Sequence, residues 1–152
     1  MALNRKDIER LIPHRPPFLW VDRILELTDT RVVAEKDVPA DLDVFQGHYP
    51  HFAVLPGVLI CEALFQTGAA LIAHRAVADG APAAGGDAVP VVTRLNNVQF
   101  RRMVRPGETL QLWVELQERL ANAYFLRGRA SVDGRVAVRL EFACASAELP
   151  AT

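Results

Sequence analysis

The sequence is poor in cysteine and in net charge, and each shortage excludes a class of protein. Cys61 and Cys144 are the only cysteines in 152 residues, too few for a disulfide framework or a cysteine-based metal site, and this favours a reducing compartment. The 17 Lys and Arg residues nearly balance the 18 Asp and Glu residues, so no overall field draws the chain to nucleic acid or an anionic membrane. We therefore expect charged docking to be local.

Long apolar runs are also missing. The first ten residues carry charges where a signal peptide needs an apolar stretch, and no uninterrupted apolar segment elsewhere approaches the roughly 18 residues of a membrane span. The composition, 51% hydrophobic and 23% charged, is that of an ordinary globular protein. We expect a single cytoplasmic domain over residues 1–152, with no membrane partner.

The pattern of the chain predicts an α+β fold, an antiparallel sheet of about six strands around one long central helix. Asn4 and Asp7 predict the start of a short helix ending near Ile12, and an apolar stretch predicts a buried helix over residues 58–78. Residues 39–57 predict an ordered functional loop and residues 79–88 a surface loop. Strands are predicted at residues 18–27, 31–38, 89–104 and 109–119, and at 124–147 split by Asp133-Gly134, with those after the helix mostly forming a meander.

Glu62 is the most unusual residue of the predicted helix. It lies among Ile60, Cys61 and Leu64, and a buried carboxyl costs free energy unless it is partnered or neutral. Gln66 is four residues later and so shares its face of the helix. The pattern fits two roles: an acid lining a narrow channel, or a hydrogen-bonded structural acid.

His48 is the candidate base, because it lies in the constrained segment Gln46-Gly47-His48-Tyr49-Pro50. A structural role is the alternative for a lone loop histidine, and His14, His51 and His74 are interpreted as structural or exposed. A metal site of His48, His51 and Glu62 has little support, because no helical His spacing accompanies it. Cys61 shows no sign of being an activated nucleophile.

Several segments together resemble (3R)-hydroxyacyl-acyl carrier protein dehydratases of the FabZ type. The resemblance rests on Gly47-His48-Tyr49-Pro50, Leu55-Pro56-Gly57-Val58-Leu59 and Glu62-Ala63-Leu64-x-Gln66. It extends over most of the chain, with residues 11–23 similar to the family's opening and residues 98–107 similar to its post-helix strand and turn.

The resemblance implies a hot-dog fold, a homodimer that is commonly assembled as three dimers, and an acyl chain carried by phosphopantetheine on acyl carrier protein. It implies His48 of one subunit facing Glu62 of its neighbour, with no cofactor and no metal. His48 would act as base and Glu62 as acid, and Gly57 would polarise the thioester carbonyl from the helix N-terminus. Gln66 would orient Glu62, and Val58 and Phe65 would contact the substrate.

Three arginines form a candidate docking site for the acidic carrier protein: Arg101, Arg102 and Arg105. A solvated, charged strand end is the alternative. The chain departs from the family pattern at His51, where glycine is usual, at Ala53, where proline is usual, and at Phe65, where a small residue is common. These departures leave the acyl length open. A hot-dog thioesterase and a non-catalytic acyl-binding partner subunit are the remaining alternatives.

Overall fold

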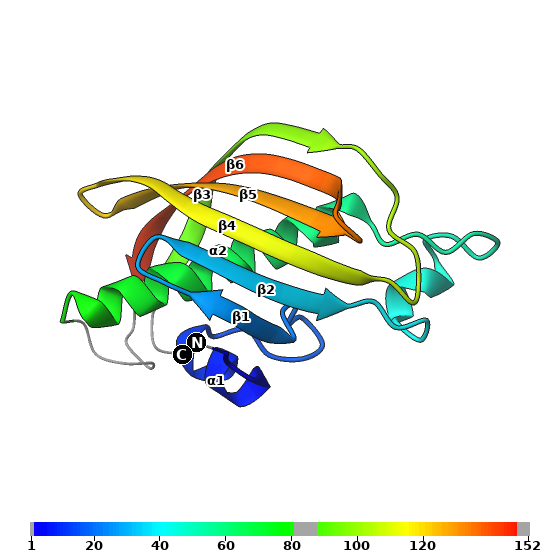
Figure 1. Cartoon of the computed structure of the whole chain (residues 1–152), viewed down its shortest axis with the longest axis horizontal. Helices are drawn as coiled ribbons and strands as arrows, with labels where there is room; N and C mark the ends of the chain where they lie inside the picture. Colours follow the sequence, from blue (N-terminus) through cyan, green and yellow to red (C-terminus); the bar gives the residue numbers. More distant parts are fainter. Residues whose placement is uncertain (1, 81–87, 149–152) are drawn as a thin grey trace.

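A computed structural model describes residues 2–80 and 88–148, and it places one six-stranded antiparallel sheet around a long helix (Figure 1). The strand order is β1-β2-β4-β5-β6-β3. The helices are α1 (Arg5–Leu11), the 3-10 helix η1 (Asp43–Gln46) and α2 (Gly57–Ala78); the strands are β1 (Arg23–Leu27), β2 (Arg31–Asp37), β3 (Ala88–Phe100), β4 (Thr109–Leu120), β5 (Ala123–Val132) and β6 (Arg135–Glu148). The predicted α+β class and six strands are confirmed. The predicted loop at 79–88 lies mostly outside the described residues.

The N-terminal elements follow from local signals. Asn4 caps α1 and forms a reciprocal capping box with Asp7, which satisfies amide groups that the first turn leaves unpaired. The first strand, predicted from residue 18, begins only at Arg23. The reason is that Phe18 and Trp20 direct backbone groups to the side chain of Gln66 on α2 and not to a neighbouring strand.

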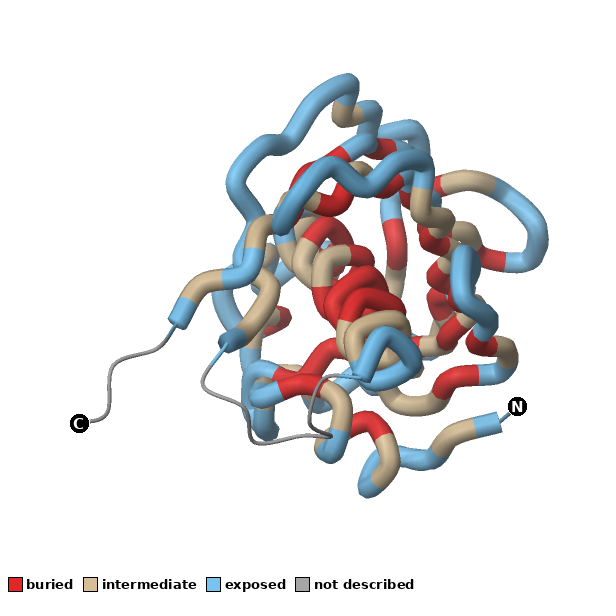
Figure 2. The backbone as a smooth tube through the Cα atoms, turned by 90° about the vertical axis from the view of Figure 1, so that its left-hand side faces the viewer, coloured by how far each residue is buried: buried red, intermediate tan, exposed pale blue. Residues whose placement is uncertain are grey.

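Helix α2 forms the centre of the core. Its buried residues face the inside of the sheet, and Figure 2 shows this buried helix with strands around it. By length and composition α2 would pass as a membrane span, with a mean hydropathy of 1.4, but 61% of that stretch is buried inside the protein. The sequence predicted no uninterrupted apolar run of that length, and α2 is in fact interrupted by Glu62, Gln66, His74 and Arg75. Burial in this way fits the core helix of a soluble protein.

The strands after α2 form a meander only in part. Strands β4, β5 and β6 follow one another, whereas β3 crosses to the far edge and pairs with β6. Strand β3 ends at Phe100, four residues earlier than predicted. Beyond the end of β3, the Arg101 N–H still donates to the Ala137 carbonyl of β6 at 2.7 Å. The Val104 carbonyl instead accepts from the Leu55 N–H at 2.8 Å, which ties residue 104 to the loop before α2.

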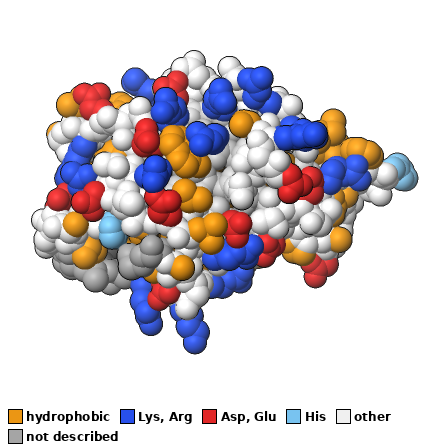
Figure 3. Space-filling model, in the orientation of Figure 1, with side chains coloured by type: hydrophobic (Ala, Val, Ile, Leu, Met, Phe, Trp, Pro, Cys, Tyr) orange, Lys and Arg blue, Asp and Glu red, His pale blue; other side chains and the backbone are white. Residues whose placement is uncertain are grey.

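The sheet has an inner and an outer face. Along β5 and over residues 138–142 of β6, buried residues alternate with more exposed ones, so every second side chain there points away from α2. The view of Figure 3 is onto this outer face, since α2 lies behind the strands in the same orientation in Figure 1. Lys and Arg side chains gather over its upper half, among scattered acidic ones.

Candidate active site

The loop between β2 and α2 holds His48 in one orientation. The 3-10 helix η1 ends at Gln46, and the His48 N–H donates to the Val44 carbonyl at 3.0 Å. The His48 carbonyl in turn accepts from the Val54 N–H at 3.1 Å. The His48 ring lies with Nδ1 2.8 Å from the Val54 carbonyl oxygen and stacks on Tyr49. Because a carbonyl only accepts, Nδ1 carries a proton, so in the neutral tautomer the lone pair is on Nε2.

His48 opens onto a cavity of about 390 Å³ between the loop, the start of α2 and the end of β3. Phe100 and Met103 in its wall are 59% and 65% exposed in the single chain, which is high for large apolar side chains. The lining residues are His48, Val54, Leu55, Gly57, Ile60, Phe100, Arg101, Arg102, Met103 and Val138. The cavity therefore combines one imidazole with an apolar floor and a basic rim.

Gly57 is the first residue of α2 and lines the same cavity. First-turn N–H groups have no acceptor within the helix, and the helix dipole makes this end partly positive. A Cβ at this position would lie 2.5 Å from the Phe100 ring, so the absence of a side chain lets Phe100 close over the amide. The predicted pairing of His48 with the Gly57 amide is thus possible within one chain.

Glu62 has polar partners, and one of them is Gln66, which the sequence placed on the same face of the helix. Gln66 Nε2 donates to Glu62 Oε2 at 2.9 Å, and the Glu62 side chain is 23% exposed. Gln66 is fully buried; its Nε2 also donates to the Phe18 carbonyl at 2.9 Å and its Oε1 accepts from the Trp20 N–H at 2.7 Å. These bonds fix the direction of the Gln66 amide, so that its N–H group must point at Glu62.

His14 is a neighbour of Glu62 that sequence reasoning missed. Its Nε2 lies 3.8 Å from Glu62 Oε2, and its Nδ1 is buried without a hydrogen-bond partner in the described part of the chain. Burial lowers the pKa of His14; the charge of Glu62 opposes this shift and Arg15 reinforces it. The neutral ring is therefore favoured. The sequence marked His14 only by its position in the segment that is similar to the family's opening. Nothing in the sequence indicated that this segment packs against α2.

His48 and Glu62 do not share a pocket within this chain. Glu62 is absent from the cavity wall, and its recorded partners are His14 and Gln66. At about 100° per residue, Glu62 is turned about 140° around α2 from Gly57 and about 160° from Ile60, both of which line the His48 cavity. The His48 cavity and the Glu62 carboxylate therefore lie on nearly opposite sides of α2.

The remaining candidates are distributed unevenly. Val58 is 70% exposed, and neither it nor Phe65 lines the His48 cavity. Phe65 is partly buried with its ring 5.2 Å from that of Phe142. Arg101 and Arg102 lie on the cavity rim, whereas the Arg105 guanidinium packs 3.7 Å from the Phe52 ring with Nε buried. The three arginines thus do not form one uniform cluster.

Thiol and metal chemistry receive no structural basis from the described residues. Cys61 and Cys144 are buried and unpaired. Burial raises the pKa of Cys61, and it raises the pKa of Cys144 to about 12, so the reactive thiolate is disfavoured at both. Within residues 2–80 and 88–148, no three His, Cys, Asp or Glu side chains come together as metal ligands would.

The architecture is the hot-dog fold, as solved structures of other proteins show. The dehydratase heterocomplex ApeI:P from Xenorhabdus doucetiae matches with a TM-score of 0.76 at 20% identity, over 93% of this chain and 91% of that one. A hypothetical thioesterase from Streptococcus pneumoniae, crystallised with coenzyme A, matches with a TM-score of 0.63 at 10% identity, over 84% of this chain and 87% of that one. At such identities the likeness establishes the fold alone.

Sequence comparison is more specific. The FabA-like domain family matches residues 12–141, which include His48, Gly57 and Glu62. Two relatives are named 3-hydroxyacyl-[acyl-carrier-protein] dehydratase FabZ. The protein from Oenococcus oeni is 44% identical over 89% of this chain and 93% of its own length. The protein from Syntrophotalea carbinolica is 42% identical over 93% of this chain and 92% of its own length. The chain belongs to the FabA-like family and, within it, to the FabZ type.

Proposed function

We infer that this protein removes water from a 3-hydroxyacyl thioester carried on acyl carrier protein, giving the trans-2-enoyl thioester in fatty acid biosynthesis. The family supports the reaction, and the relatives' names supply the substrate class. The observation that carries the chemistry is the His48 ring, whose Nδ1 is held by the Val54 carbonyl so that its basic Nε2 is available at an apolar cavity. Two buried, unpaired cysteines suit a cytoplasmic location.

The elimination needs a base, an acid and a partner for the thioester oxygen. His48 Nε2 takes the α-proton, and the Gly57 N–H stabilises the negative charge that develops on the carbonyl oxygen. Glu62 gives a proton to the departing hydroxyl, which leaves as water. Gln66 donates to Oε2 of Glu62, so we assign the reactive proton to Oε1, for which the described residues offer no partner.

The site needs a second copy of the chain. His48 and Glu62 face opposite sides of α2, so a Glu62 that completes the His48 cavity comes from a neighbouring subunit. Strand β3 suits the contact, because it is a 13-residue edge strand, most of whose residues are exposed, including Val92 and Leu95. Such an edge readily pairs with another strand. We therefore propose a homodimer, in which three dimers can associate further.

Subunit mixing tests both the reaction and the dimer. His48→Ala and Glu62→Gln chains are each expected to be inactive, but a dimer with one of each keeps one intact site. Random 1:1 mixing makes half of the dimers mixed, and in each mixed dimer one of the two sites is intact. The unmixed dimers stay inactive, so activity should return to about a quarter of the wild-type activity. The enoyl product is followed by absorbance and free thiol by a thiol reagent. A mixture as inactive as its parents contradicts the shared site, and thiol release without enoyl product supports a thioesterase instead.

A further inference from the structure

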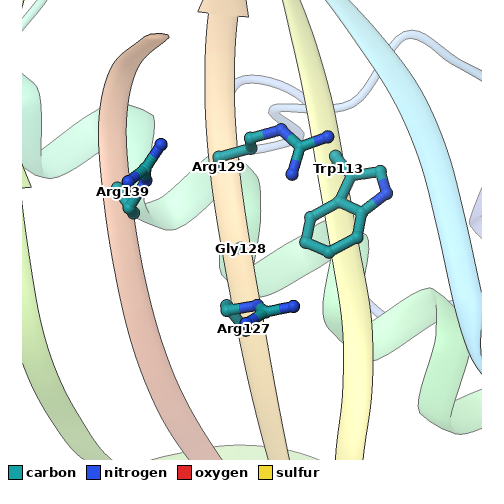
Figure 4. Close-up of a pocket in the computed structure, with 5 residues that line it drawn as sticks. All are labelled: Trp113, Arg127, Gly128, Arg129 and Arg139. Atoms are coloured by element: carbon teal, nitrogen blue, oxygen red, sulfur yellow. The ribbon is translucent and has the colours of Figure 1, made fainter.

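The outer face of the sheet carries a second basic site that the proposed reaction does not use. Trp113 on β4, Arg129 on β5 and Arg139 on β6 lie in one row, because Trp113 pairs with Arg129 and Arg129 with Arg139 in the strand register. They line a hollow of about 300 Å³ with Arg127 and Gly128. Figure 4 shows their side chains on the strands with α2 behind the sheet. We call Trp113, Arg129 and Arg139 the outer arginine row.

The outer arginine row is unfavourable for the isolated protein. Like charges directly opposite each other on neighbouring strands destabilise a sheet, and Arg129 and Arg139 are such a pair. Neither has a carboxylate within ion-pair distance among the described residues. The Arg129 guanidinium instead lies 4.1 Å from the centre of the Trp113 ring.

In the adjacent row on the same strands, each arginine lies opposite a carboxylate, which is the usual arrangement of charges across a sheet. There Glu115 on β4 pairs with Arg127 on β5, which in turn pairs with Glu141 on β6, so that charges of opposite sign alternate. Arg127 Nη2 lies 3.4 Å from Glu115 Oε1. The sheet therefore balances its charges in one row and leaves positive charge unbalanced in the next. This difference points to an anionic partner for the unbalanced row.

The outer arginine row continues to the mouth of the His48 cavity. Arg139 pairs with Gln99 on β3, and the Gln99 side chain accepts from Arg101 Nη1 at 3.1 Å. Arg101 and Arg102 line the cavity, as does Val138, the residue directly before Arg139 on β6. A partner that delivers a substrate at Arg101 and Arg102 would thus reach Arg139 across the width of β6 and β3.

We propose that the outer arginine row binds the acidic surface of the carrier protein that presents the acyl chain at the His48 cavity. The proposal rests on the proposed function, because it takes the substrate to be carrier-bound. A macromolecule with spread negative charge fits a row that extends from the cavity rim over three strands. Its binding would supply the carboxylates that the sheet itself does not provide, and steering of this kind acts mainly on association and on its salt dependence.

The double variant Arg129→Gln/Arg139→Gln tests the proposal. With 3-hydroxyacyl-carrier protein its KM should rise roughly tenfold, and the dependence of KM on salt should weaken. With the same acyl group on free pantetheine, KM and kcat should stay at the wild-type values. The unfolding midpoint should be equal or higher, because the like-charge pair is gone, which separates docking from a structural role. Arg31→Gln/Arg119→Gln is the matched control, since both of these arginines pair with carboxylates.

A binding experiment keeps the proposal distinguishable from the proposed function. Fluorescently labelled carrier protein is titrated with wild type, the double variant and the control, and anisotropy reports the affinity whether or not any substrate turns over. Weaker binding by the double variant alone supports the proposal, even if dehydration itself fails. Unchanged carrier affinity and KM would overturn it, as would equal losses on the carrier-bound and pantetheine substrates. Quenching of Trp113 by inorganic phosphate, with no effect of the carrier protein, would also overturn it in favour of a small-anion site.

Discussion

The Nδ1 atom of His48 lies 2.8 Å from the carbonyl oxygen of Val54, and this contact sets the tautomer of the proposed base. His48→Asn keeps an N–H near the position of Nδ1 but has no Nε2, so it should preserve the loop and lose the base. We expect kcat to fall by about 10²- to 10⁴-fold with an unchanged unfolding midpoint. His51→Asn, on the exposed part of the same loop, is the control. A His48→Asn enzyme that retains a kcat close to that of wild type would contradict the role of His48.

Gln66 should matter for both stability and turnover. Gln66→Leu leaves the Trp20 N–H, the Phe18 carbonyl and Glu62 Oε2 without their partner. Unsatisfied buried polar groups cost about 1–3 kcal/mol each, so we expect a loss of at least about 2 kcal/mol, measured by urea unfolding. Gln66→Glu keeps the acceptor for Trp20 but removes the donor to Glu62, and kcat should fall more than KM changes. Wild-type kcat in Gln66→Glu would remove Gln66 from the orientation of Glu62.

Phe65 is expected to limit acyl length. The resemblance to the FabZ type places Phe65 where a small residue is common. The Phe65 side chain is partly buried, with its ring 5.2 Å from that of Phe142. In Phe65→Ala the ratio of kcat/KM for long over short acyl chains should rise, by about tenfold or more. A series of 3-hydroxyacyl substrates of graded length measures the ratio. Phe125→Ala, at an outward position of β5, should leave it unchanged.

Arg102 and Arg105 should behave differently, although they are close together in the sequence. Arg102 lies on the cavity rim, so Arg102→Gln should raise KM for carrier-bound substrate and leave stability unchanged. Arg105 packs on Phe52, so Arg105→Gln should remove about 1 kcal/mol of stability, or about 2–4 °C in Tm. Thermal unfolding and kinetics on both variants separate the roles. If Arg105→Gln instead raised KM for carrier-bound substrate without changing Tm, Arg105 would belong to the docking surface.

The Arg23–Asp37 ion pair predicts a pH-dependent contribution to stability. Hydrogen bonding to Arg23 lowers the pKa of Asp37 to about 2, and Thr109 also donates to it. A carboxyl with a depressed pKa stabilises the fold above its unfolded pKa near 3.8, and this contribution disappears as the pH falls toward about 2. Asp37→Asn should therefore lower Tm modestly at about pH 7 and hardly at all near pH 2, because the pair is partly exposed. A Tm difference that is equal at both pH values would contradict this.

The sequence determined the local elements and the candidate groups. The Asn4 capping box, the turn at Asp133-Gly134 and the apolar stretch of α2 are signals between residues close together in the chain, and the structure follows them. His48, Gly57 and Glu62 could be named because loop glycines and prolines and a carboxyl in an apolar helix are unusual in any context.

Only the tertiary structure decided which groups meet. Gln66 takes the backbone of Phe18 and Trp20 out of the first strand, although these residues lie far from it in the sequence, and His14 approaches Glu62 through the same packing. The position of β3 beside β6 and the unbalanced outer arginine row also depend on strand order, which local patterns do not encode. Side-chain periodicity fixes the face on which a residue lies, but its partners come from elements that pack together only when the whole chain folds.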